Sequence, residues 1–153
     1  MLEKIQELLK NNNINFREIH HEPTRTSEES AVARGEDIKI GGKALVVKVG
    51  DSFKVFVLSA AKKLDSSLIK KYFHAKNIRF ATADELMNLT GLVPGSVPPF
   101  GKPIIDLDLY LDNSILDNNK IAFNAGSLTD SIIMDVKDYL NIAQPIIFKF
   151  SKD

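Results

Sequence analysis

The sequence predicts an α+β fold with a mixed, curled, barrel-like β-sheet of about seven strands and four or five flanking helices. The main observation is the irregular order in which predicted helices and strands follow one another along the chain. The helices show helical spacing of apolar residues, and the strands are rich in β-branched residues. A doubly wound α/β protein would instead alternate strand and helix regularly. The second observation is a predicted β-hairpin at residues 44–58, and the third is a length of 153 residues, which suits one domain.

Composition narrows the class of protein. Lys plus Arg and Asp plus Glu each total 20, so the balanced charge does not favour strong nonspecific binding to nucleic acid. With no cysteine, disulfides, thiolate metal sites and a cysteine nucleophile are excluded. No stretch approaches the length of about 18 apolar residues that a membrane span needs. We therefore expect a soluble, cytoplasmic protein with no membrane association.

The N-terminal elements follow from local chemistry. Residues 2–10 carry apolar side chains at helical spacing and predict an amphipathic helix. Residues 14–19 suggest a short strand. Thr26 and Glu29 have the spacing of a capping box, in which Thr26 reaches forward and Glu29 reaches back, and they predict a helix that stops at Gly35.

The hairpin at residues 44–49 and 53–58 has two strands rich in β-branched and aromatic residues around a Gly-Asp-Ser turn. Residues 103–111 alternate between apolar and polar side chains, which is typical of a half-buried strand. The other expected elements are helices that begin near 65–67 and at 82–85, a short helix over residues 135–140, and strands at 78–81, 121–123, 131–134 and 146–150.

The segment from Gly91 to Gly101 is the least suited to ordinary scaffold. It contains three glycines and three prolines, so it predicts a loop. Its other residues are mostly apolar, which is unusual for a surface connection. Such a loop suits the wall of a pocket, although a buried crossover that packs on the core is the alternative interpretation.

Several kinds of catalytic site find no support in the sequence. The three histidines lack the spacing of metal ligands, so no metal site and no cofactor are expected. Gly-x-Ser-x-Gly, Gly-x-Gly-x-x-Gly and Walker motifs are absent. Asp106 and Asp108 would share one face of the expected strand, but a solvated face explains them better than acid–base catalysis.

Two short segments are candidate pocket edges. Lys43 follows two glycines at the start of a buried strand, where the backbone can approach a ligand closely. The alternative for Lys43 is a solvated lysine at a strand end. Asn124 to Ser127 form a turn after a buried strand, and become a polar pocket edge if they meet the glycine–proline loop in space.

Three features, in this order and spacing, resemble the YbaK-type aminoacyl-tRNA deacylases, a family that also supplies the editing domain of bacterial prolyl-tRNA synthetases. The features are His21-Glu22-Pro23-Thr24 with Thr26 to Ala31, then Lys43, then Leu92 to Gly101. The resemblance implies a single editing domain over residues 1–153. It also implies a free-standing enzyme that acts in trans on the ester between a wrong amino acid and tRNA.

The resemblance also implies roles for individual residues. Lys43 would hold the aminoacylated 3′ end, and the loop from Gly95 to Pro99 would shape the amino-acid pocket. Backbone N–H groups of Gly95, Ser96 and Val97 could stabilise the developing oxyanion, so these three and Lys43 are the candidate catalytic residues. The candidate substrate-binding residues are Thr26, Pro94, Pro98, Pro99, Phe100, Asn124 and Gly126. Asp130 and Ser131 receive no role.

An apolar, proline-lined pocket would favour a small amino acid. Alanine on tRNA specific for proline is therefore the first expectation, and serine, threonine and cysteine remain open. The expected partners are the 3′ end and acceptor stem of aminoacyl-tRNA and a recruiting synthetase. A basic cluster could touch the stem or be only a solvated face; it comprises Lys62, Lys63, Lys70, Lys71, Lys76 and Arg79. The alternative function is a non-catalytic module that binds a small molecule or a tRNA end.

Overall fold

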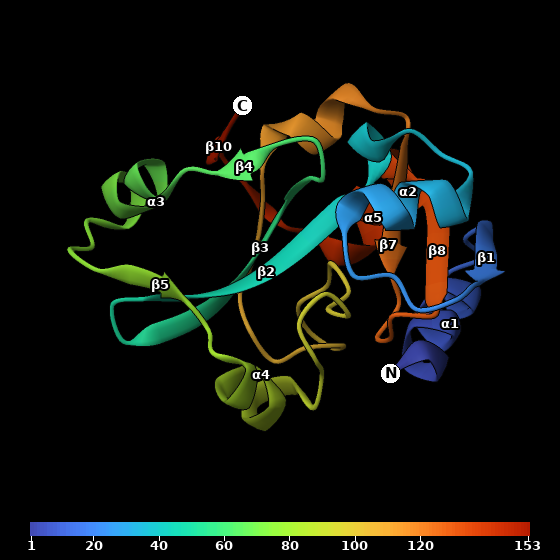
Figure 1. Cartoon of the computed structure of the whole chain (residues 1–153), viewed down its shortest axis with the longest axis horizontal. Coiled ribbons are helices and arrows are strands. Elements are labelled where there is room, and N and C mark those ends of the chain that lie inside the picture. Colours follow the sequence, from blue (N-terminus) through green and yellow to red (C-terminus); the bar gives the residue numbers. More distant parts are fainter.

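The computed structural model describes residues 1–153 and divides its ten strands among three sheets (Figure 1). The largest sheet is mixed and has the order β5 (Ile78–Phe80), β2 (Gly42–Val49), β3 (Ser52–Ser59), β6 (Leu109–Leu111) and β9 (Ile146–Ile147). The second is antiparallel, with the order β1 (Phe16–His20), β8 (Asp130–Asp135) and β7 (Lys120–Asn124). The third pairs β10 (Ser151–Lys152) with β4 (Lys63–Leu64).

Five α-helices and two 3-10 helices complete the chain. They are α1 (Leu2–Asn11), α2 (Ser27–Arg34), η1 (Ile38–Ile40), α3 (Ser66–Phe73), α4 (Ala83–Thr90), η2 (Asn113–Asp117) and α5 (Val136–Ala143). In Figure 1 the long β2–β3 hairpin crosses the molecule, with α3 and β5 near one end and the three-stranded sheet near the other. None of these helices is long and apolar enough to cross a lipid bilayer.

The expected α+β class is confirmed, but the barrel-like curl is wrong. The five-stranded sheet ends in open edges at β5 and β9, and the strands do not join into one sheet. A single parallel bridge between Gly41 and Ala122 is the only strand-type pairing between the two larger sheets. The sheet cannot close because several of its strands have only two or three residues, which leaves too few ladder hydrogen bonds to continue the curl.

The alternating segment at residues 103–111 is also mostly not a strand. Only Leu109–Leu111 pairs, while the N–H groups of Ile104 and Ile105 both donate to the Gly101 carbonyl at 2.9 Å in a turn. Asp106 and Asp108 therefore share no strand face. Their side chains are exposed and lie beside lysines, Asp106 at 3.3 Å from Lys102 and Asp108 at 3.5 Å from Lys54.

The helix starts were predicted well. The Thr26 side chain accepts a hydrogen bond from the Glu29 N–H, but the Glu29 carboxylate accepts from the Arg25 N–H, so the expected reciprocal box is only half formed. A complete capping box occurs instead at Thr82 and Glu85, where each side chain accepts from the backbone of the other. Residue 82 therefore fixes where α4 begins.

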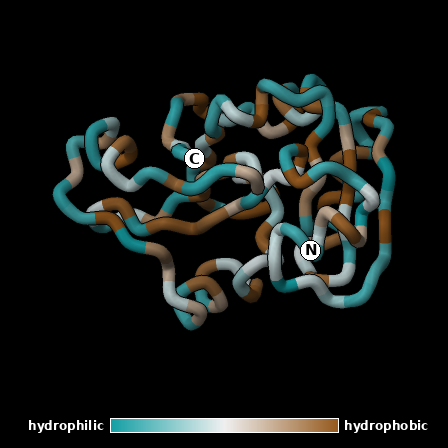
Figure 2. The backbone as a smooth tube through the Cα atoms, turned by 45° about the horizontal axis from the view of Figure 1, so that its top comes forward, coloured by the Kyte–Doolittle hydropathy of each residue, from teal (hydrophilic) through white to brown (hydrophobic).

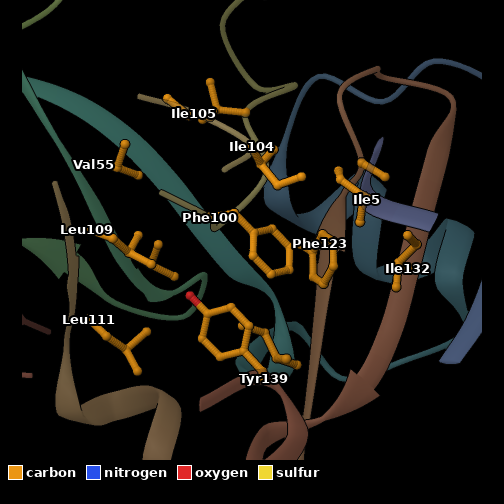
Figure 3. Close-up of a cluster of buried hydrophobic side chains, with 14 of the residues drawn as sticks. Ile5, Val55, Phe100, Ile104, Ile105, Leu109, Leu111, Phe123, Ile132 and Tyr139 are labelled. Carbon is orange, nitrogen blue, oxygen red and sulfur yellow. The ribbon is translucent and has the colours of Figure 1, made fainter. Parts of the chain in front are cut away.

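The core lies between the two larger sheets and α1 and α5. Figure 3 shows the ring of Phe100 beside those of Phe123 and Tyr139, and their centroids lie 5.5 and 5.6 Å from the Phe100 centroid. All three side chains are at most 1% exposed. In Figure 2 the tube of the central strands is largely hydrophobic, and hydrophilic segments prevail at the outer loops. The aromatic cluster thus fixes the end of the glycine–proline loop from beneath.

Gly42 permits the close approach of β2 and β7 that this core requires. A Cβ at this position would lie 2.6 Å from Ile121 Cδ1 and 2.8 Å from its Cγ1, and Ile121 is fully buried. We expect Gly42→Ala to lower the free energy of unfolding by about 1–3 kcal/mol, because the core has no room for the methyl group. Urea denaturation measures this, with Gly50→Asn at the exposed hairpin turn as a control expected to change little.

Candidate functional site

One cavity of about 180 Å³ lies at the junction of the two larger sheets. Its walls come from the segment before and within α2, from η1, from the start of β2, from the end of β7 and from the glycine–proline loop. The lining residues are 24–27, 30, 31, 34, 36–38, 40–45, Ala60, Gly95, Val97, Ala122 and Asn124. Segments that are distant in the sequence therefore meet around one small space.

Lys43, the second residue of β2, lines this cavity. Its Nζ donates to the Lys62 carbonyl at 2.9 Å, which holds the side chain in one direction. Partial burial lowers the pKa of the Lys43 ammonium, and the nearby Glu28 carboxylate opposes that shift. Lys43 and Gly95 thus face the same cavity, as the sequence predicts, although the ammonium already has one backbone partner.

The glycine–proline loop contributes Gly95 and Val97 to the wall. Gly95 has a φ of 87°, in the left-handed region that favours glycine. The backbone N–H groups of Gly95 and Val97 form no hydrogen bond within the protein. The Ser96 N–H differs, because it donates to the Val93 carbonyl at 3.1 Å. Ser96 therefore cannot supply the N–H group that was expected of it.

Asn124 and Gly126 meet the loop in space, which is the condition that the sequence set for a polar pocket edge at that turn. Asn124 Nδ2 donates to the Gly95 carbonyl at 2.6 Å, and the Gly126 N–H donates to the Ser96 carbonyl at 3.0 Å. Asn124 also lines the cavity, whereas Gly126 does not. The end of β7 consequently fixes the position of the loop.

A buried arginine, which the sequence interpretation missed, completes the cavity. Arg34 at the end of α2 is 8% exposed. Its Nε donates to Ser131 Oγ at 3.0 Å and its Nη2 donates to Asn124 Oδ1 at 3.1 Å. Burial lowers the pKa of Arg34 to about 10, which leaves it charged at neutral pH. A hydrogen-bond chain thus runs from Arg34 through Asn124 to Gly95.

The remaining candidate residues divide clearly. Thr26 lines the cavity, as expected. Pro94 is exposed and outside the lining, whereas Pro98 and Pro99 are buried and also do not line the cavity. The Pro99 carbonyl accepts a hydrogen bond from the Tyr139 hydroxyl at 2.6 Å, and Phe100 belongs to the core. The expected proline lining is therefore wrong: the prolines stiffen the loop outside the lining, and both polar and apolar residues form the wall of the cavity.

Ser131 and Asp130 occupy opposite faces of β8. Ser131 is 1% exposed and its Oγ lies 2.8 Å from His21 Nε2, on the side of Arg34. Asp130 Oδ1 lies 2.9 Å from His20 Nδ1, and hydrogen bonds from His20 and Ser127 lower the pKa of the Asp130 carboxyl. Neither residue lines the cavity, so Ser131 acts on it only through Arg34 and Asn124.

The basic cluster is partly neutralised. Lys62 pairs with Asp153, and Arg79 forms a bidentate pair with Glu85 at 2.7 and 2.9 Å. Lys63, Lys70, Lys71 and Lys76 are exposed and form no ion pair. Because the Lys62 carbonyl holds Lys43, one end of this cluster adjoins the cavity.

The fold and the site define an α+β protein with one small cavity whose lining includes a lysine, a buried arginine and two residues of the glycine–proline loop. The chain belongs to the aminoacyl-tRNA editing domain family, whose model matches residues 21–142. This confirms the resemblance noted from the sequence.

Two curated relatives differ in how much of their own length the chain covers. The chain is 34% identical over 151 residues to the multifunctional Ser/Thr-tRNA deacylase ProXp-y of Escherichia coli strain K12, covering 95% of this chain and 89% of that protein. It is 30% identical over 107 residues to a proline–tRNA ligase of Macrococcus caseolyticus, covering 70% of this chain and 18% of the ligase.

A solved structure confirms the fold. It is described as a candidate trans-editing enzyme for prolyl-tRNA synthetase. It superposes with a TM-score of 0.83 at 24% identity and covers 99% of this chain and 97% of that one. At this identity the likeness supports the fold and no more.

Proposed function

We propose that the protein is an aminoacyl-tRNA deacylase that acts in trans and hydrolyses the ester of a small amino acid mischarged onto tRNA. The observation that carries this proposal is that Lys43, Gly95 and Val97 border one cavity, and that the N–H groups of Gly95 and Val97 have no acceptor within the protein. Family membership supports the reaction class. Action in trans is supported by the match along 89% of the Escherichia coli deacylase.

The chemistry needs no protein nucleophile. Water attacks the ester carbonyl carbon, a C–O bond forms, and the carbonyl electron pair moves onto oxygen. The Gly95 and Val97 N–H groups donate to that oxyanion, which is charged only after attack, so they stabilise the transition state more than the substrate. The intermediate then collapses: the bond to the ribose oxygen breaks, that oxygen takes one proton, and a carboxylate and a second proton are released.

Lys43 acts in this scheme as a clamp and not as a base. Its ammonium is held by the Lys62 carbonyl at the cavity wall, where it can attract the phosphate of the 3′-terminal nucleotide. An ammonium has no lone pair to accept a proton, so its charged form serves binding. Lys43 thus contributes to binding of the tRNA end, and the loop amides contribute to the chemical step.

The polar wall favours serine or threonine over alanine as the edited amino acid. Thr24 and Ser30 are buried, their hydroxyl oxygens lie 2.8 Å apart, and both residues line the cavity. A cavity that offers hydrogen-bonding groups to a substrate hydroxyl discriminates against analogues that lack it. The Ser/Thr-tRNA deacylase among the relatives supports the same order.

We propose that the tRNA acceptor stem lies along the free lysines that follow the cavity, including Lys63, Lys70 and Lys71. Ion pairing of Lys62 and Arg79 removes part of the cluster's charge, and the net charge of the chain is zero. These features favour weak binding of tRNA by the protein alone. Recruitment through prolyl-tRNA synthetase fits the ligase relative, in which the same domain is covalently attached.

A panel of mischarged tRNAs tests the proposal. We expect Ser-tRNA and Thr-tRNA to lose their amino acid roughly tenfold or more faster than Ala-tRNA, since one hydrogen bond in a desolvated site is worth about that factor. Cys-tRNA and correctly charged Pro-tRNA complete the panel. If no aminoacyl-tRNA is hydrolysed faster than in buffer while the 3′ end still binds, the protein is a binding module instead.

A further inference from the structure

Arg34 has a charge that the protein itself does not balance. It takes part in none of the seven ion pairs of the structure, and its two identified hydrogen-bond acceptors, Ser131 Oγ and Asn124 Oδ1, are neutral. A guanidinium that is 8% exposed and lacks a carboxylate partner is unusual, because buried charges are normally paired. The structure therefore leaves room for an external anion.

The two acids that line the cavity are engaged elsewhere. The Glu36 carboxylate lies 2.9 Å from Lys120 Nζ and 3.9 Å from Arg17 Nη1. The Asp37 carboxylate accepts the Lys39 N–H at 2.9 Å and so caps η1. Neither of these acids pairs with Arg34, so the cavity keeps an uncompensated positive charge at this point.

The free nitrogen of Arg34 faces the cavity. Nη1 forms no hydrogen bond in the protein, yet no buried side-chain nitrogen or oxygen lacks a partner, so Nη1 is reached by solvent. It lies 3.6 Å from where a Cβ on Gly41 would stand, and Gly41 lines the same cavity. Nε and Nη2 meanwhile fix the guanidinium plane, which aims Nη1 at that space.

We infer that Arg34 Nη1 binds the carboxyl group of the aminoacyl moiety, most strongly as the carboxylate that is released by hydrolysis. This inference rests on the proposed function and goes beyond it, because it assigns the product's anion to a specific group. The hydrogen-bond chain from Arg34 through Asn124 to the Gly95 carbonyl places the guanidinium next to the loop that faces the ester. A charge-assisted hydrogen bond there strengthens as the carbonyl oxygen becomes negative.

Size favours a carboxylate over a phosphodiester. The cavity of about 180 Å³ is smaller than the roughly 300–1,000 Å³ of pockets that enclose drug-sized ligands. A phosphodiester carries a nucleoside on each side and would need space for both, whereas a carboxylate ends a small molecule. The buried Arg34 therefore suits the acyl end, and Lys43 at the wall remains for the nucleotide.

Binding of free amino acids to the full chain tests the inference without tRNA. Titrations monitored through the side-chain ¹⁵N–H signals of Arg34 would compare L-serine, L-serinamide and inorganic phosphate. Serinamide keeps the ammonium and hydroxyl groups but lacks the negative charge. We expect serine to bind roughly tenfold or more tightly than serinamide, because a hydrogen bond to a charged group is worth at least that factor.

Variants separate binding from folding. In Arg34→Gln the preference for serine over serinamide should fall to about one, and Arg34→Lys should recover part of it. Arg79 lies on the edge strand β5 and pairs with Glu85. The variant Arg79→Gln should therefore keep the full preference for serine over serinamide. A purely structural arginine would change the melting temperature and leave the preference of the folded fraction unchanged.

The inference is overturned if wild type binds serine and serinamide equally, if it binds neither, or if phosphate binds at Arg34 and serine does not. These results are independent of the deacylation assay. A protein that hydrolyses aminoacyl-tRNA but shows no carboxylate preference would keep the proposed function and lose the inference. A protein that prefers serine over serinamide but hydrolyses no aminoacyl-tRNA would keep the anion site and lose the proposed function.

Discussion

Replacing Lys43 by alanine is expected to lower kcat/KM for deacylation by roughly 10- to 100-fold, because one charged contact with the substrate is lost. The decrease should come mainly from a higher KM. The reason is geometric. Lys43 Nζ is fixed by the Lys62 carbonyl at the cavity wall, and the ammonium there binds the tRNA end equally in the ground state and the transition state. Uniform binding of this kind changes KM and leaves kcat nearly unchanged.

The pH dependence of tRNA binding distinguishes a lysine that acts as a charged clamp from a lysine that acts as a base. Burial lowers the pKa of Lys43, and the charged form is present below that pKa. A clamp that needs the charge therefore loses affinity for tRNA as pH rises through the lowered pKa. In a lysine that acted as a base, activity would instead rise over the same interval, and alanine would reduce kcat. Steady-state kinetics across alkaline pH distinguishes the two.

Lys48→Ala is the matched control, because Lys48 lies on the same strand and outside the cavity lining. Its Nζ stands 5.7 Å from the Phe53 ring centroid, so its removal should cost a little stability and leave KM unchanged. Equal effects of both substitutions on KM would mean that general positive charge, and not the clamp, binds the tRNA.

The predictions that succeeded rest on local chemistry. The hairpin of β2 and β3 forms around Gly50, where the β-rich runs predict it, although Ser52, expected in the turn, pairs with Val49 at the start of β3. Thr26 and Thr82 cap helices at the predicted positions. In each case a few neighbouring residues determine the backbone, so a short stretch of sequence contains the information that is needed.

The predictions that failed depend on tertiary contacts. The alternation at residues 103–111 has the period of a strand. The N–H groups of Ile104 and Ile105 instead donate to the Gly101 carbonyl, so the start of this segment forms a turn. The Ser96 N–H similarly donates to the Val93 carbonyl, so it is already engaged within the loop. Sequence periodicity reports which side chains are buried, and it does not report which acceptor the backbone finds.

Arg34 shows what was missing for the site. In the sequence it is the last residue of a short helix, where a basic side chain is ordinary because it complements the helix dipole. Its importance appears only when Ser131 and Asn124, about a hundred residues away, are seen to hold it. The signal that could have indicated it is Asn124, which the sequence singled out but paired with the loop alone.

Replacing Phe100 by alanine is expected to lower the free energy of unfolding by about 3–5 kcal/mol, as is usual when a buried aromatic ring is removed. Phe100 is 1% exposed, and its ring packs edge-on against Phe123 and Tyr139 (Figure 3). The sequence interpretation assigned it to substrate binding. Its place in the core predicts a loss of stability with an unchanged order of amino-acid preference.

Urea denaturation should show a lower midpoint for Phe100→Ala with a similar slope, and Phe100→Leu should lose less because it leaves a smaller cavity. Deacylation of Ser-, Thr- and Ala-tRNA, normalised to the folded fraction, should keep its order in both variants. The Pro99 carbonyl remains tied to the Tyr139 hydroxyl, so the loop keeps one anchor without the ring. A changed preference at unchanged stability would instead place Phe100 against the substrate, and the pocket would extend beneath the loop.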